Sequence, residues 1–154
     1  MSMTLHTPMS MTLHTPSKHH TPQPHSTLRP ENLSASNNAC WALGELAIKI
    51  PVDTLQPAVA PLAERLVPIL AAPAGAMPRS ILENSAITLG RVAWMCPEPL
   101  AGALEHFVWP WCQVLRSIRD DLEKEHAFLG LCRLLRLNPQ VLCWWSDWGC
   151  TEQF

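Results

Sequence analysis

Apolar side chains recur at intervals of three and four residues from about residue 36 to residue 139. This spacing places them on one face of an α-helix, and the strict alternation of a half-buried β-strand does not occur. Proline and glycine clusters divide the pattern into separate elements. The pattern therefore predicts an all-α core, with helices expected over residues 37–50, 54–71, 81–96, 98–118 and 123–137.

Internal prolines complicate two of these helices. Pro61 and Pro68 lie inside the 54–71 helix. Each removes a main-chain hydrogen-bond donor, so we expect this helix to bend or to fray at its end. Pro110 lies near the middle of the 98–118 helix, where it predicts a kink.

One line of sequence occurs twice. NNACWALGELA at residues 37–47 reappears as NSAITLGRVA at residues 84–93, and Leu-Gly pairs stand at 43–44, 89–90 and 129–130. Glycine inside a helix costs roughly 1 kcal/mol relative to alanine, so its recurrence indicates that a neighbouring helix approaches closely. One further helix lies between successive Leu-Gly helices, and two helices per 40–47 residues is the HEAT and armadillo period. We expect a HEAT-repeat α-solenoid fragment of about 2.5 helix pairs, with a compact five-helix bundle as the alternative.

The two ends of the chain differ in composition from the helical part. The octapeptide MSMTLHTP occurs twice in tandem at the N-terminus, and five of the seven histidines lie before residue 34 among Thr, Ser and Pro. Such a segment buries too little apolar surface to offset its chain entropy. The sequence therefore predicts a disordered low-complexity tail at 1–33, HEAT repeats at 34–139 and a divergent Trp- and Cys-rich tail at 140–154.

Charge and cysteine usage narrow the class of protein. The formal net charge is −2, which gives no electrostatic reason to expect nucleic acid or an anionic membrane as a partner. The sequence contains no run of about 18 apolar residues, so it predicts no membrane-spanning helix. The six cysteines are scattered without a CxxC pair, which favours a reduced cytosolic or nuclear compartment.

No catalytic motif accompanies the helical pattern. A Gly-rich phosphate loop, GxSxG and HExxH do not occur, and His106 and His126 lie on different predicted helices without a Cys or acid partner at motif spacing. We therefore expect no enzymatic activity and no cofactor. The histidines of the N-terminal tail can chelate Zn²⁺ or Ni²⁺ loosely, but a tail without fixed geometry does not predict a metal site.

Four strings carry a resemblance to a known family. SNNACWALGELA, ILENSAITLGRVAWMCPE, FVWPWCQVLRSIRDDLEKEHAFLGLC and LNP follow one another between residues 36 and 139. In order and spacing they resemble the C-terminal HEAT repeats of the transportin family of importin-β-type karyopherins. The resemblance covers about two thirds of the chain and omits residues 1–33 and those after about 142. It implies a nuclear import receptor that is found in the cytoplasm and the nucleus.

The resemblance also implies a binding site. In this family the second helix of each repeat lines a concave surface, on which the C-terminal repeats accept the hydrophobic or basic part of a proline-tyrosine nuclear localisation signal. By motif position the implied cargo contacts are Asn37, Trp41, Asn84 and Ile87. Tryptophan offers a broad apolar face, and asparagine can bond the main chain of an extended peptide. By our repeat alignment Trp41 and Ile87 are equivalent positions, so we expect them to form one patch.

Other interpretations of these residues remain open. From the residues alone, a Trp at helical spacing is typical of a core and Asn37 is typical of a helix N-cap. For the full-length family the resemblance also implies Ran GTPase and nucleoporins as partners. The resemblance implies that RanGTP displaces cargo by binding N-terminal repeats, to which no part of this sequence is matched. The resemblance further implies that adjoining repeats, also outside the matched strings, grip the proline-tyrosine end of the signal. Without that second contact the gain from linking two epitopes is lost, so we expect signal peptides to bind weakly, at about micromolar affinity or poorer. The alternative is a truncated, non-transporting interaction scaffold or a non-functional gene fragment.

Overall fold

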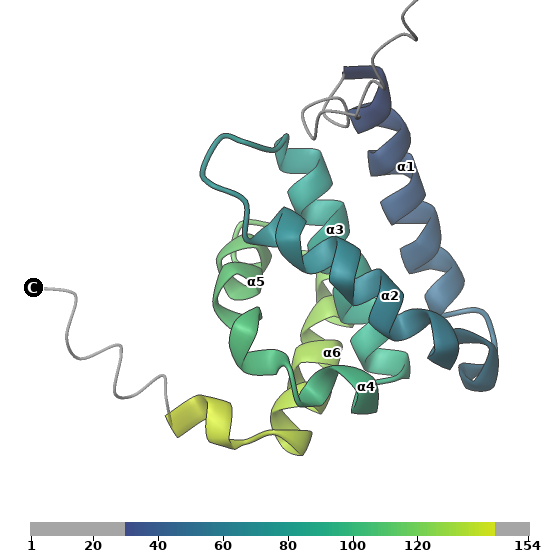
Figure 1. The fold of residues 1–154 in the computed structure, drawn as a ribbon, viewed down its shortest axis with the longest axis vertical. Helices are drawn as coiled ribbons and strands as arrows, with labels where there is room; N and C mark the ends of the chain where they lie inside the picture. Colours follow the sequence, from purple (N-terminus) through teal and green to yellow (C-terminus); the bar gives the residue numbers. More distant parts are fainter. Residues whose placement is uncertain (1–29, 144–154) are drawn as a thin grey trace, which may run out of the picture.

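The structure, a computed structural model, describes residues 30–143. Within that range every regular element is helical, which confirms the all-α prediction (Figure 1). In chain order the elements are α1 (Pro30–Ala47), α2 (Val52–Leu70), α3 (Arg79–Met95), α4 (Glu98–Ala101), the 3₁₀ turn η2 (Leu104–His106), α5 (Val108–Leu115) and α6 (Leu122–Leu137). A further helical stretch covers 140–143.

The structure describes only a small part of the two expected tails. Helix α1 begins at Pro30, seven positions before the expected start, so residues 30–33 are helical. The rest of the expected N-terminal tail, and the C-terminal tail from residue 144, lie outside the described residues. Their disorder and divergence stay predictions.

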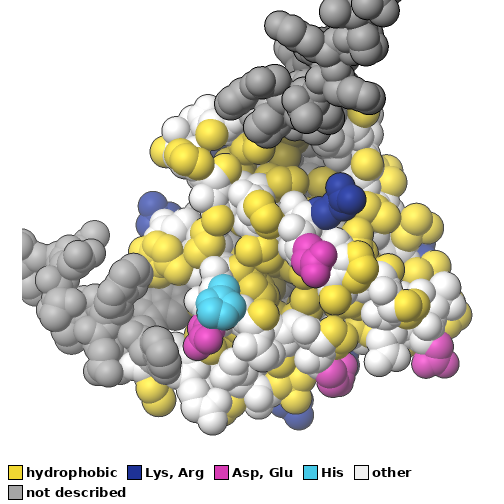
Figure 2. Space-filling model, viewed as in Figure 1, with side chains coloured by type: hydrophobic (Ala, Val, Ile, Leu, Met, Phe, Trp, Pro, Cys, Tyr) yellow, Lys and Arg dark blue, Asp and Glu magenta, His cyan; other side chains and the backbone are white. Residues whose placement is uncertain are grey.

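The helices form two layers. Helix α3 packs between α1 and α6, and these are the three helices that carry the Leu-Gly pairs. Helices α2 and α5 cover α3 from the other side, and α2 crosses in front of α3 in Figure 1. This alternation of one inner and one outer helix agrees with the HEAT-type repeat expected from the sequence. Figure 2 shows the side on which α2 lies, with hydrophobic side chains spread over it and only isolated charged groups.

Helix α3 is the centre of the core. Every residue from Ser85 to Ala93 is buried, because α3 has neighbours on both sides and above. A helix that is buried all round needs partners for its polar side chains as well as for its apolar ones. Its buried polar residues are Ser85, Thr88 and Arg91. Ser85 and Thr88 contact Cys40 on α1 through their hydroxyl groups, and Arg91 pairs with Glu45 on the same helix.

The three Leu-Gly glycines lie where helices meet, as the sequence predicts. A Cβ atom on Gly44 would lie 2.7 Å from Thr88 Oγ1, and one on Gly90 would lie 2.7 Å from Ala127 Cβ. A Cβ on Gly130 would lie 2.8 Å from the carbonyl carbon of Gly90. Real Cβ atoms do not approach other atoms this closely, so glycine is required by the packing of α1, α3 and α6.

The expected single helix over 98–118 is wrong. This segment divides into α4, η2 and α5, and the break lies between Gly102 and Phe107 and not at Pro110. Pro110 occupies the first turn of α5, where a main-chain N–H has no partner inside the helix, so proline is tolerated there. The apolar spacing continues through the break because Leu104 and Phe107 also face the core.

Helix α2 contains the internal prolines noted in the sequence, and the bend expected at them stays a prediction. It continues from Val52 to Leu70 through Pro57, Pro61 and Pro68. Its buried residues, Leu55, Val59, Leu66 and Leu70, form one stripe along the helix. Burial of this stripe against the core compensates for the hydrogen bonds that the internal prolines remove.

Candidate functional site

The four candidate residues lie on adjoining turns of α1 and α3. Asn84 Nδ2 on α3 donates a hydrogen bond of 3.0 Å to Asn37 Oδ1 on α1. Trp41 follows Asn37 by one helical turn, and Ile87 follows Asn84 by about one turn. Both asparagines lie inside helices, so Asn37 is not the N-cap of α1. The structure therefore places a hydrogen-bonded amide pair between α1 and α3, with an apolar residue about one turn after each amide.

Exposure separates the two apolar residues. The Trp41 side chain is 50 % exposed, so it is not a core residue of the described part of the chain. Ile87 is only 5 % exposed and belongs to the core. Trp41 therefore provides accessible apolar surface, whereas Ile87 offers little surface of its own. Equivalent positions in the repeat differ in burial because α3 has a neighbour on each side and α1 has a described neighbour on one side only.

A row of polar contacts joins α1 to α3 along the candidate site. Thr88 Oγ1 donates a hydrogen bond of 2.6 Å to the Cys40 carbonyl oxygen, and the Cys40 Sγ lies 3.7 Å from Ser85 Oγ. Together with the Asn37–Asn84 pair, these contacts fix the relative position of the two helices. Sequence reasoning did not single out Ser85 and Thr88. Their signal was that they are polar residues placed on an otherwise apolar helix in the repeated string NSAITLG.

Arg91 continues this row and connects three helices. It is 3 % exposed, and its Nη1 lies 2.9 Å from Glu45 Oε1 on α1 while its Nη2 lies 3.5 Å from Glu123 Oε1 on α6. Arg91 Nε and Nη1 have no hydrogen-bond partner within the described residues, so the Glu45 contact is an ion pair by distance only. A hydrogen bond from Lys49 and the charge of Arg91 hold the pKa of Glu45 below its ordinary value of 4.5.

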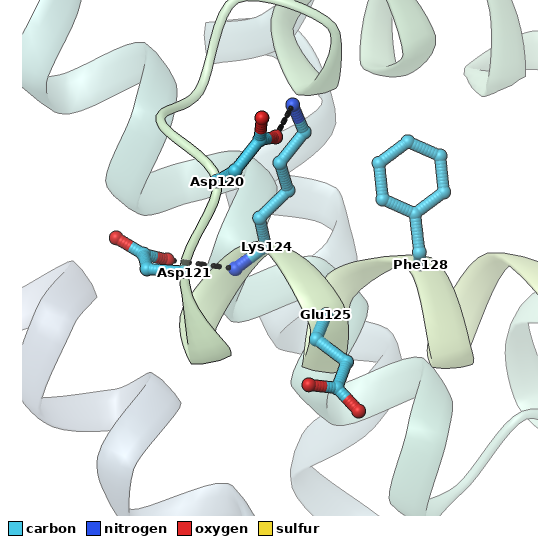
Figure 3. Close-up of a pocket in the computed structure, with 5 residues that line it drawn as sticks. All are labelled: Asp120, Asp121, Lys124, Glu125 and Phe128. Atoms are coloured by element: carbon cyan, nitrogen blue, oxygen red, sulfur yellow. Dashed lines mark hydrogen bonds and ion pairs between the residues drawn. The ribbon is translucent and has the colours of Figure 1, made fainter.

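The acidic turn before α6 caps that helix. Asp121 Oδ1 accepts hydrogen bonds of 3.0 and 3.2 Å from the main-chain N–H groups of Glu123 and Lys124. Lys124 Nζ lies 2.7 Å from Asp120 Oδ1 (Figure 3). The shallow pocket at this turn has a volume of about 270 Å³ and is lined by Asp120, Asp121, Lys124, Glu125 and Phe128. Two of its carboxylates are already occupied, which agrees with a solvated loop and helix cap.

The other tryptophans have different environments. Trp111 is fully buried and donates a hydrogen bond of 3.0 Å from Nε1 to the Ala86 carbonyl oxygen. Trp94 stacks on His126 with ring centroids 4.8 Å apart, and Arg133 donates to the Trp94 carbonyl oxygen. Trp111 and Trp94 are therefore packing residues. Trp109 is 45 % exposed on α5.

Among residues 30–143 no cluster of three His, Cys, Asp or Glu side chains is arranged to hold a metal ion. The tail histidines considered as metal ligands lie outside this range. In the same part of the chain, no helix combines the length and the apolar character that crossing a membrane requires.

Three features define a HEAT-type helical-repeat protein: paired helix layers, Leu-Gly pairs that recur after 46 and 40 residues, and glycine-mediated contacts between successive inner helices. No protein-family model matches the chain. Transportin-1 of Oryza sativa subsp. japonica is 53 % identical to it over 109 residues. Transportin-1 of Homo sapiens is 43 % identical over 112 residues, and Importin subunit beta-2 of Schizosaccharomyces pombe is 42 % identical over 111 residues. The chain therefore belongs to the transportin family, as a HEAT-repeat segment of it.

The matched region is a small part of these relatives. The alignments cover 71 %, 73 % and 72 % of this chain, but only 12 % of each of the three relatives. The chain thus spans about one eighth of the length of the relatives that it matches, and the family assignment applies to that segment.

Proposed function

We propose that this chain contributes a cargo-binding surface to a nuclear import receptor of the transportin type. The surface consists of Trp41, Asn37 and Asn84, with Ile87 as the apolar floor beneath them. It holds an extended peptide from a proline-tyrosine nuclear localisation signal. The chemistry is that of binding alone, without catalysis. Within the longer receptor, the same proposal includes Ran GTPase and nucleoporins as partners and movement between cytoplasm and nucleus.

The observation that carries the proposal is the half-exposed indole of Trp41 beside a hydrogen-bonded amide pair. An exposed tryptophan provides a rigid apolar contact area, and tryptophan is frequent among residues that dominate binding energy. The Asn37–Asn84 hydrogen bond uses one N–H of one amide and one oxygen lone pair of the other. Each amide therefore keeps further donor and acceptor capacity for the main chain of a peptide. The similarity to transportins at 43–53 % identity supports the choice of partner.

The test is fluorescence anisotropy with a labelled proline-tyrosine signal peptide, after circular dichroism has shown each variant to be folded. We expect saturable binding at about micromolar affinity or weaker, and a loss of at least about tenfold in Trp41→Ala, which corresponds to about 1.4 kcal/mol. Trp109→Ala is the matched control, because Trp109 is 45 % exposed but lies on α5 in the outer layer.

The substitution Ile87→Asp would be a poor test of whether Ile87 contacts cargo. Ile87 is 5 % exposed, so a carboxylate there would be buried and would unfold the chain whether or not the residue contacts cargo. Ile87→Val removes one methylene group and keeps the core apolar, and we expect it to weaken peptide binding less than Trp41→Ala. Folded protein that does not bind the peptide, or equal losses in Trp41→Ala and Trp109→Ala, would reject the cargo site. The first of these results would favour an interaction scaffold without transport function.

A further inference from the structure

Helix α1 carries three large apolar side chains that remain partly exposed. Trp41, Leu43 and Leu46 are all exposed on it. Segment 1–29 is joined directly to the first residue of this helix, Pro30. The candidate peptide site therefore lies on the helix to which this long stretch of the same chain is attached.

Segment 1–29 has the composition of a peptide ligand. It contains Pro8, Pro16, Pro22 and Pro24 and two copies of the string MTLHTP, in which leucine and methionine are the apolar residues. Proline-rich segments bind aromatic-lined surfaces because their backbone is already restricted to an extended conformation, so less entropy is lost on binding. A half-exposed tryptophan beside an amide pair is a surface of that kind.

Segment 1–29 and the helical part of the chain carry complementary charges. Segment 1–29 contains Lys18 and Arg29 and no acidic residue, whereas all 13 acidic residues of the chain follow Pro30. Two of them flank the site: Glu45 lies about one turn after Trp41, and Glu83 directly precedes Asn84. Both are incompletely buried, and each pairs with an exposed basic side chain that a competing cation can replace, Lys49 for Glu45 and Arg79 for Glu83. Glu45 also lies 2.9 Å from the buried Arg91.

The attachment point allows the segment to reach the site. Trp41 is eleven positions after Pro30 on the same helix, a distance of about 16 Å along the axis at 1.5 Å per residue. A chain returning alongside α1 covers that distance with about five extended residues at roughly 3.3 Å each. The string TPQPH at 21–25 is therefore near the minimum length for contact, and both MTLHTP copies lie within reach.

We propose that segment 1–29 occupies the Trp41 site of its own chain and competes there with external peptides. This inference rests on the proposed function, since it concerns the same site. It assigns the tail the role of an internal ligand that lowers the apparent affinity for cargo. The tandem duplication supplies two equivalent strings that can occupy the site in turn.

The expected effect is modest. A short tether between a ligand and its site gives an effective concentration on the order of 1 mM. If the tail binds with a Kd of about 0.1–1 mM, the apparent Kd of an external peptide rises by a factor of about 2 to 10, because that factor is one plus the ratio of effective concentration to Kd.

The experiment keeps the full-length chain and changes only the tail. The test variant carries Leu5→Asp, Leu13→Asp, Lys18→Glu and Arg29→Glu, and the control variant carries Ser2→Ala and Ser10→Ala. Two quantities are measured: the affinity for a labelled proline-tyrosine signal peptide, and amide hydrogen exchange along residues 37–46. We expect the test variant to bind the peptide about 2 to 10 times more tightly and to exchange faster than the control. Both differences should disappear in the Trp41→Ala background.

The two measurements separate this inference from the proposed function. Equal affinity and equal exchange in the test and control variants would overturn the inference and leave the cargo site intact. If no external peptide binds, the proposed function fails, and the exchange comparison still decides whether the tail covers the site. Protection that decreases on dilution of the protein would also overturn the inference, because the tail would then act on a second copy.

Discussion

The contact between Gly90 and Gly130 gives the sharpest test of the packing described above. These two glycines bring α3 and α6 together at their backbones. We predict that Gly130→Ala destabilises the protein although alanine is the better helix former. A Cβ on residue 130 would lie 2.8 Å from the Gly90 carbonyl carbon and 3.0 Å from Gly90 Cα. Carbon atoms are comfortable at about 3.5–4.0 Å, so the two helices would have to separate locally by the order of 1 Å.

Two opposing terms set the magnitude. Alanine in place of glycine inside a helix contributes roughly 1 kcal/mol of helix propensity. Overpacking costs about 1–3 kcal/mol, and the upper end applies when the obstructing atoms belong to a backbone that cannot change rotamer. The expected net loss in the free energy of unfolding is therefore about 2 kcal/mol. We expect Gly90→Ala to cost a similar amount, because its Cβ would meet both the backbone and the side chain of Ala127.

The assay is equilibrium urea unfolding followed by far-UV circular dichroism, with the midpoint compared at constant slope. Gly102→Ala is the matched control: a Cβ there would meet nothing within 4 Å, and its φ of −68° suits alanine. This control should be about 0.4–1 kcal/mol more stable than the parent. If Gly130→Ala were as stable as the parent, or if Gly102→Ala lost as much as Gly130→Ala, the close-contact explanation of the recurring glycine would be refuted.

Three further predictions concern Arg91, Glu45 and Trp111. Arg91→Met should change the free energy of unfolding by less than about 1 kcal/mol, because the incompletely buried Glu45 and Glu123 can be hydrated. The double variant Glu45→Gln/Glu123→Gln leaves a buried guanidinium unpaired, so in urea unfolding it should lose about 2–4 kcal/mol more than Arg91→Met does. Because the pKa of Glu45 is lower in the folded chain than in the unfolded chain, its carboxylate stabilises the fold above the unfolded pKa, and this stability is lost as the pH falls through the folded pKa. In thermal unfolding below pH 4.5, Glu45→Gln should therefore be destabilised by acid less than the parent. Trp111→Phe should cost about 1–3 kcal/mol by the same urea assay, because it removes a buried hydrogen bond and leaves a cavity.

The repeat was predictable because its signal is local. The Leu-Gly pairs at 43–44, 89–90 and 129–130 mark three helices, and glycine at a recurring position has one simple physical cause, which the structure confirms. The break at 102–107 was not predictable from the same pattern. Leu104 and Phe107 keep the three- and four-residue spacing through a segment that is not one continuous helix, because the core lies on the same side of it.

The relative placement of the four candidate residues was predictable, but their exposure was not. Motif position identified Asn37, Trp41, Asn84 and Ile87 together, and the structure places them on adjoining turns. Nothing in the sequence distinguishes the half-exposed Trp41 from the buried Ile87, because burial depends on which neighbours each helix has. The ion pairs of Arg91 were missed for a related reason, since they join residues that are 46 and 32 positions away in the chain.

The same contacts that hold α1 against α3 also prepare the proposed site. Asn37 and Asn84 are fixed by each other, and the Thr88 hydrogen bond to Cys40 fixes the next turn of the helix pair. A binding group that is already immobilised loses less conformational entropy when a ligand arrives, so more of its interaction energy is available as affinity. Trp41 adds the apolar contact area at the exposed edge of this rigid pair. A substitution at Asn84 therefore changes both the helix packing and the site, whereas Trp41→Ala removes contact surface and leaves the polar row between the helices in place.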